Sequence, residues 1–90
     1  MKRRVAVTGL GVVSPVGIGL KTFWSNLVAG KSGITNITSF DTTDFPVKIA
    51  GEVKDFNASD FIADRKAVRH MDRDSQFALA AAIMAAEDSG

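Results

Sequence analysis

The chain has 90 residues, 46% of them hydrophobic, and a formal net charge of +1. This length is typical of one small domain or of part of a larger one, and a charge near zero argues neither for nor against any partner. Because the sequence has no cysteine and a single histidine, His70, it excludes disulfides, thiolate metal sites, a cysteine nucleophile and a metal site built on histidines alone.

The first predicted element is the β-branched apolar run "VAV" at residues 5–7, which is typical of a strand buried on both faces of a parallel sheet. Gly9 and Gly11 follow it, as they would in a dinucleotide-binding loop. The third glycine of that fingerprint is replaced by Ser14, and Pro15 delays the helix that should open there. The sequence therefore favours a buried strand and turn over a nucleotide site.

The basic start "MKRR" and the apolar run after it resemble the first two regions of a secretion signal. Thr8 and Ser14 interrupt the apolar run and no A-x-A cleavage site follows, so we favour a cytoplasmic chain. No segment approaches the roughly 20 apolar residues of a membrane span. We expect neither a membrane nor a nucleic acid as a partner.

Residues 20–29, "LKTFWSNLVA", have the apolar spacing of an amphipathic helix. The apolar stripe, interpreted as core, consists of Leu20, Phe23, Trp24, Leu27 and Val28. Gly30 is predicted to end this helix in the left-handed conformation, with Lys31 near the negative end of the helix dipole. "GKS" resembles the end of a P-loop, but Ser25 stands where that motif needs its first glycine.

Residues 34–46 are polar and rich in turn-forming residues, and they predict a surface loop. Residues 47–54, "VKIAGEVK", alternate as a half-exposed strand does, with Val47, Ile49 and Val53 on the inward face. Gly51 in this strand indicates a bulge or the close approach of another backbone.

Asn57 is predicted to cap a short helix that has Asp60 at its third position. A long helix is then predicted over residues 65–89, with Gly90 as its stop. Its second half, residues 77–86, is apolar on nearly every face and must therefore be buried all round. Ninety residues with one other good helix can hardly cover it, so we expect the chain to be part of something larger.

No catalytic set is visible, because Ser14 lacks the flanking glycines of a nucleophile elbow, and Asp72 and Asp74 point to different helix faces. A basic cluster does stand out at the start of the predicted long helix, where the helix dipole disfavours cations. It consists of Arg65, Lys66, Arg69 and Arg73. Spacing alone leaves two readings open, namely an acidic partner or a solvated surface with local ion pairs.

Four stretches together resemble the N-terminal segment of β-ketoacyl-acyl-carrier-protein synthases of the elongating, type II kind. They are "RRVAVTGLGVVSPVG", "FWSNLVAGKSGIT", "FDTTDFPVKIAGEVKDFN" and "RHMDRDSQFALAAAIMAAEDSG", and they cover essentially the whole chain. The resemblance implies an α/β fold without an internal boundary. It would be a partial thiolase-like α/β/α layer of first strand, helix, second strand and long buried helix, incomplete without the rest of the protein.

The resemblance also implies an activity, the decarboxylative condensation of an acyl group with malonyl-acyl-carrier-protein, carried out by a homodimer. The family's catalytic cysteine and two histidines lie beyond this segment, and His70 matches neither histidine. We therefore expect no catalytic, cofactor-binding or metal-binding residue here, and no activity of the isolated chain. We expect the isolated chain to self-associate, because its apolar helices lack partners.

In related synthases the basic start of this helix contacts the acidic acyl carrier protein. Lys66 and Arg69 match those positions, and His70 stands where a lysine is often found. This departure weakens the patch at neutral pH, because an imidazole is then mostly neutral. Two alternatives remain: a free-standing module that binds carrier protein or oligomerises without catalysis, and, less favoured, a nucleotide-binding domain.

Overall fold

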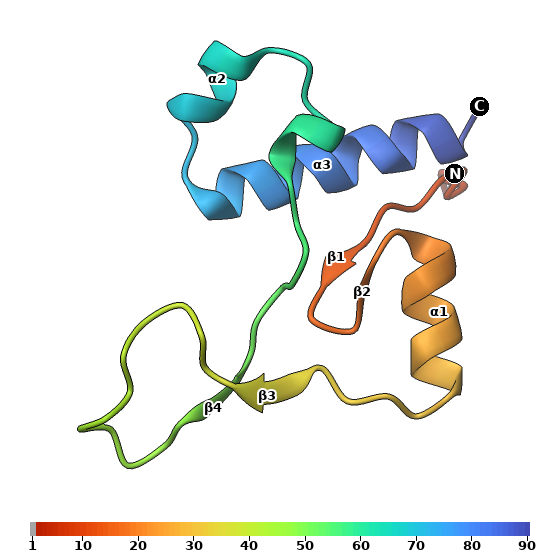
Figure 1. Cartoon of the computed structure of the whole chain (residues 1–90). Coiled ribbons are helices and arrows are strands. Elements are labelled where there is room, and N and C mark those ends of the chain that lie inside the picture. Colours follow the sequence, from red (N-terminus) through yellow and green to blue (C-terminus); the bar gives the residue numbers. More distant parts are fainter. Residues whose placement is uncertain (1) are drawn as a thin grey trace. The chain divides into compact units, whose positions relative to one another are not determined.

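The structure is a computed structural model that describes residues 2–90 and separates into two compact units. One unit is the segment Val13–Phe56, and the other joins the N-terminal residues up to Val12 to Asn57–Gly90. Both strands and helices are present, which agrees with the predicted α/β class at this level (Figure 1). The three-layer arrangement implied by the resemblance stays a prediction.

The unit Val13–Phe56 holds two antiparallel strand pairs and one helix. Its elements are β1 (Val13–Ser14), β2 (Gly17–Ile18), α1 (Leu20–Val28), β3 (Ile34–Asn36) and β4 (Ile49–Gly51). In the first pair Val13 lies opposite Ile18, and in the second Thr35 lies opposite Ala50.

Ser14 closes the β1–β2 hairpin. Its hydroxyl accepts hydrogen bonds from the backbone N–H groups of Val16 (3.2 Å) and Gly17 (3.1 Å) and donates one to the carbonyl of Gly17 (3.0 Å). The amide side chain of Asn26 donates to the carbonyl of Val16 at 2.7 Å and so ties α1 to the hairpin. Ser14 is thus a turn residue, as its short hydroxyl side chain favours.

The predicted end of α1 is confirmed. Gly30 has a φ of +73°, its N–H donates to the carbonyl of Leu27 (3.1 Å), and the next N–H, of Lys31, donates to Asn26 (3.0 Å). This pair of bonds is the Schellman arrangement, which satisfies carbonyls left open at a helix end. Because the "GKS" sequence follows a helix instead of a strand, it is no P-loop.

The prediction that the α1 stripe is core is wrong for much of the stripe within residues 2–90. Leu20 and Phe23 are half-buried, but Leu27 and Val28 are exposed and Trp24 is 61% exposed. An amphipathic helix is buried only where another element covers its apolar face. The described residues provide no such cover here.

The loop prediction is wrong for residues 34–36, which form β3, because strand pairing depends on a partner far along the chain. The strand predicted at residues 47–54 is confirmed in the shorter form β4. Its inward face was assigned wrongly at Ile49, which is exposed, whereas Ala50 is half-buried. The bulge or backbone approach predicted at Gly51 is not found: the register is regular, and a Cβ there would lie 3.2 Å from Cγ of the Pro15 ring, a side-chain atom.

Glu52 orders the loop after β3. Its carboxylate accepts the N–H of Thr38 (2.9 Å), the hydroxyl of Thr38 (3.1 Å) and the N–H of Ser39 (3.1 Å). Hydrogen bonding by the Ser39 side chain, followed by the backbone of Thr38, lowers the pKa of Glu52 from 4.5 to about 2. The bonds use both carboxylate oxygens as acceptors and therefore favour the ionised form.

We expect the order of this loop to depend on pH at the acid end. The pKa of Glu52 is lower in the folded state, so its contribution is complete above about pH 4.5 and is lost as the pH falls toward about 2. A carboxyl-carbon NMR titration should place the midpoint of Glu52 well below that of ordinary glutamates. In Glu52→Gln the amide resonance shifts of Thr38 and Ser39 over this range should disappear. A midpoint near pH 4.5 would contradict the described bonds.

The second unit contains η1 (Ala58–Asp60), α2 (Arg65–Arg69) and α3 (Arg73–Asp88). The predicted cap is confirmed, because the Asn57 side chain accepts the N–H of Ser59 at 3.1 Å. The unit also holds the buried residues of the described chain, which are Ala58, Ile62 and Ala80.

The prediction of one long helix over residues 65–89 is wrong. Asp72 has an extended backbone and accepts the N–H of Ser75 at 2.8 Å, so it caps a new helix. Asp64 likewise caps α2. In a continuous helix the N–H groups after Asp72 would bond to carbonyls of the preceding turn. A capping carboxylate takes the place of those carbonyls, so a second cap favours a second helix.

α3 is only partly covered within the described chain. Ala80 is fully buried on this helix, but Leu79 beside it is exposed. This agrees with the expectation that ninety residues can hardly cover the apolar stretch at residues 77–86 on every face.

Residues 5–7 form no strand within the described chain, and Val5 is 92% exposed and Val7 79% exposed. A strand needs a neighbouring strand to pair its backbone groups, and no described segment provides one here. The strand prediction is therefore not met in these 90 residues.

The two glycines that follow contact α3. A Cβ at Gly9 would collide with the carbonyl oxygen of Ala85, and one at Gly11 with that of Ala81. Between them, the N–H of Leu10 donates to the carboxylate of Asp88 at 3.0 Å. The glycines therefore serve close packing against a helix, which accounts for the glycine-x-glycine spacing without a phosphate.

Candidate functional site

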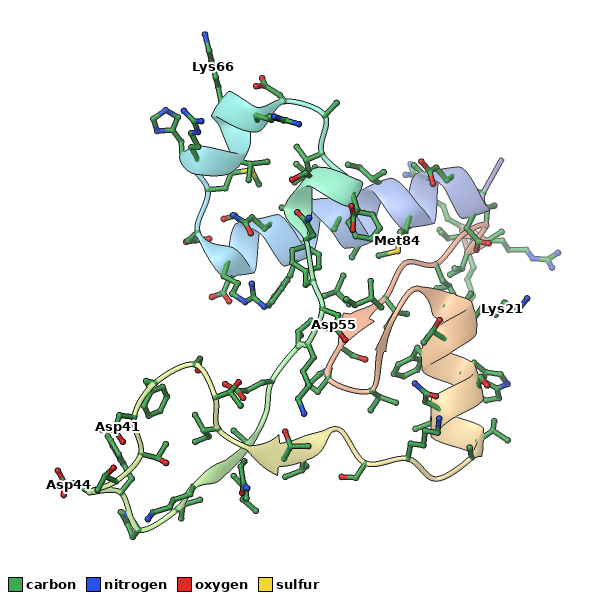
Figure 2. The ribbon with its side chains drawn as sticks, viewed as in Figure 1. Lys21, Asp41, Asp44, Asp55, Lys66 and Met84 are labelled. Atoms are coloured by element: carbon green, nitrogen blue, oxygen red, sulfur yellow. The ribbon has the colours of Figure 1, made fainter. Side chains whose placement is uncertain are left out.

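The basic cluster singled out in the sequence is divided between two helices. Arg65, Lys66 and Arg69 lie on α2, whereas Arg73 is the first residue of α3. All four are exposed. Figure 2 shows Lys66 extending from α2 away from α3.

The division of the helix reverses the electrostatic argument made from the sequence. Because α2 ends at Arg69, this residue lies in its last turn, where the helix dipole favours cations, whereas Lys66 is the second residue of the helix. The expectation of an unfavourable position is therefore wrong for Arg69. Within residues 2–90 the side chains of Lys66, Arg69 and His70 have neither a hydrogen bond nor an ion pair, and the same holds for Arg65 beside them.

Arg73 does not belong with this group. Its guanidinium lies 4.8 Å from the centre of the Phe77 ring, one turn further along α3, in a cation–π contact. The structure therefore brings together Lys66, Arg69 and His70, which we call the α2 cationic surface. His70 is exposed and follows directly after α2, where its N–H donates to the carbonyl of Ala67 and the next N–H, of Met71, donates to the carbonyl of Val68.

The backbone beneath this surface is anchored. The amide side chain of Gln76, in α3, donates to the carbonyls of Val68 (3.4 Å) and Met71 (3.3 Å). At the other end of α2, the carboxylate of Asp64 accepts the N–H groups of Lys66 (3.0 Å) and Ala67 (3.2 Å). The three side chains are therefore presented to solvent from a positioned helix.

Sequence reasoning missed the residues that position this surface. Asp64 and Asp72 each precede a helix, and aspartate is among the strongest N-cap residues, so this signal was available. The role of Gln76 depends on a contact eight residues back along the chain and carries no comparable local signal.

Other kinds of site find no support among the described residues. Within residues 2–90 no group of three or more histidine, cysteine, aspartate or glutamate side chains is placed to hold a metal ion. None of the helices described here has the length and apolar character needed to cross a membrane.

Comparison with known proteins identifies the family. Residues 2–90 match the family described as "Beta-ketoacyl synthase, N-terminal domain". The 3-oxoacyl-[acyl-carrier-protein] synthase 2 of Coxiella burnetii is 51% identical over 89 residues, and that of Vibrio cholerae 49%. In each case the match covers 99% of this chain and 21% of the relative, so the chain spans about a fifth of their length.

A solved structure agrees with these matches. The ishigamide ketosynthase/chain length factor superposes with a TM-score of 0.91 at 42% identity, covering the whole of this chain and 22% of the other. This similarity shows that the chain has the fold of the corresponding part of a ketosynthase. Taken with the family match across nearly every residue, it shows that the chain belongs to the beta-ketoacyl synthase N-terminal domain family.

Proposed function

We propose that this chain is the N-terminal part of a fatty-acid-elongating 3-oxoacyl-acyl-carrier-protein synthase. The supporting observation is 46–51% identity, over nearly the whole chain, to relatives that carry this name in Coxiella, Vibrio and Staphylococcus. The reaction joins an acyl group to malonyl-acyl-carrier-protein with loss of carbon dioxide. The whole protein would act as a homodimer with a thiolase-like layered fold, in the cytoplasm.

The chemistry would belong to the other four-fifths of the protein. Forming the acyl thioester requires a thiolate nucleophile, and these 90 residues contain no cysteine. By itself the chain would therefore be inactive, without a cofactor or metal of its own.

The role of this segment in the whole protein would be to bind the carrier protein. Lys66, Arg69 and His70 form an exposed surface without internal partners, which suits an acidic protein that supplies the missing carboxylates. Spacing along α2 supports one shared face, because residues three and four positions apart are neighbours on a helix.

The coding sequence beyond Gly90 tests the proposal directly. We expect an open reading frame of about four more such lengths that contains a cysteine and two histidines, since the relatives are about five times as long as this chain. A stop codon directly after Gly90 would contradict the proposal and favour a free-standing module that binds carrier protein or oligomerises.

A further inference from the structure

The segment at residues 5–7 has the composition of a central strand but no cover. Val5 and Val7 are 92% and 79% exposed, Ala6 between them is exposed too, and the three residues belong to no strand within residues 2–90. Successive side chains of a strand point to opposite faces, so an entirely apolar run needs cover on both faces. Its backbone is also a template on which another strand can pair.

The residues that follow run antiparallel to α3. A Cβ at Gly9 would meet Ala85 and Ser89, whereas one at Gly11 would meet Ala81 and Ala85. Two residues forward in this segment therefore correspond to four residues backward in the helix. Two extended residues advance by about 6.6 Å and four helical residues by about 6 Å, so the segment follows the helix axis in the opposite direction (Figure 1).

This alignment places residues 5–7 beside the point where the chain leaves α3. The N–H of Leu10 donates to the carboxylate of Asp88, the last residue of α3, at 3.0 Å. Residues 5–7 precede this contact and therefore extend past the last turn of α3, which explains why the helix does not cover them. Gly90 has a φ of +84°, and a left-handed glycine after a helix turns the chain away from the helix axis.

We propose that the first strand of the chain beyond Gly90 pairs with residues 5–7 as a parallel neighbour, with α3 as part of the crossover. The inference rests on the proposed function, because relatives about five times as long as this chain imply the continuation. A helix antiparallel to a strand returns the chain to the beginning of that strand, so the next strand alongside it runs in the same direction. Consecutive elements are usually neighbours in space, which favours this strand over later ones.

The test is disulfide crosslinking in the full-length synthase, with its native cysteines replaced by serine. Val5→Cys or Val7→Cys is combined with single cysteines placed in turn along the about 25 residues after Gly90, enough for a connection and a strand. A disulfide forms only where the two Cα atoms lie within about 7 Å. We expect Val7→Cys to crosslink about two positions further along the chain than Val5→Cys. Lys66→Cys, which lies on α2 and points away from α3 (Figure 2), is the control and should crosslink with none of them.

The order of the crosslinks decides the outcome. If the partner of Val7→Cys comes earlier in the chain than that of Val5→Cys, the strands are antiparallel and the inference is overturned, as it is if neither position forms a crosslink.

Hydrogen exchange of the unaltered synthase provides a check without cysteine replacement. Alternate amides of residues 5–7 should exchange at least about 100-fold more slowly than in an unstructured chain. Unprotected exchange at all three amides overturns the inference. A reading frame that stops after Gly90 overturns the proposed function as well, whereas an open frame with the wrong crosslinks overturns the strand pairing alone.

Discussion

Lys66→Glu combined with Arg69→Glu is expected to weaken binding of acyl carrier protein to the full-length synthase by about 10- to 30-fold at low salt. The two substitutions turn attraction into repulsion toward an acidic surface, and the loss should lie mainly in the association rate. Raising the salt from about 0.05 M to about 1 M should remove most of the difference, because screening then acts within about 3 Å. Stopped-flow association kinetics at the two salt concentrations measure this.

The control for this experiment is an equal charge change elsewhere. Lys21→Glu with Lys48→Glu reverses two exposed cations of the other unit and should alter the association rate far less. Condensation with small thioester mimics should stay nearly intact in both double variants, since no carrier protein takes part. Equal loss with carrier-protein and small substrates would show that Lys66 and Arg69 maintain the fold instead of docking a partner.

Gly11→Val is expected to destabilise the full-length protein by about 3 kcal/mol or more. Its Cβ would collide with the carbonyl oxygen of Ala81, which belongs to the backbone of α3 and cannot turn aside as a side chain can. Differential scanning fluorimetry should show a clear fall in the thermal midpoint, together with a lower soluble yield.

Gly30→Asn is the matched control for this substitution. A Cβ at Gly30 meets nothing within 4 Å, and asparagine tolerates the left-handed φ of +73° better than other residues do. Its midpoint should therefore change little. If Gly11→Val melts like wild type, then the segment around Gly9 and Gly11 does not pack on α3. If the wild-type protein binds a dinucleotide and Gly11→Val loses that binding without losing stability, then Gly9 and Gly11 belong to a dinucleotide-binding loop.

Local signals in the sequence predicted the features that depend on neighbouring residues. The helix α1, the terminating role of Gly30 and the cap at Asn57 are confirmed, because each rests on hydrogen bonds within a few positions. The resemblance to the synthase family was also visible in short stretches, and it selected Lys66, Arg69 and His70.

Features that depend on distant partners could not be predicted in this way. β3 exists because residues 34–36 pair with residues 49–51, and the glycines at 9 and 11 are required by a helix about 70 positions later. Trp24 and Val5 have the pattern of buried residues but stay exposed here, because burial depends on what covers a face and not on the face itself.

For the docking surface, the sequence by itself determined the residue types and their order along the chain. The structure shows how they group, and only the tertiary structure decided that Gln76 of α3 holds the carbonyls of Val68 and Met71 beneath them. Asp72 caps α3 and α2 ends at Arg69, which places Arg69 at the favourable end of α2. Arg73, four residues after Arg69, is instead held over Phe77. The physical reason is the competition for backbone N–H groups between a capping carboxylate and a continued helix, which spacing alone does not resolve.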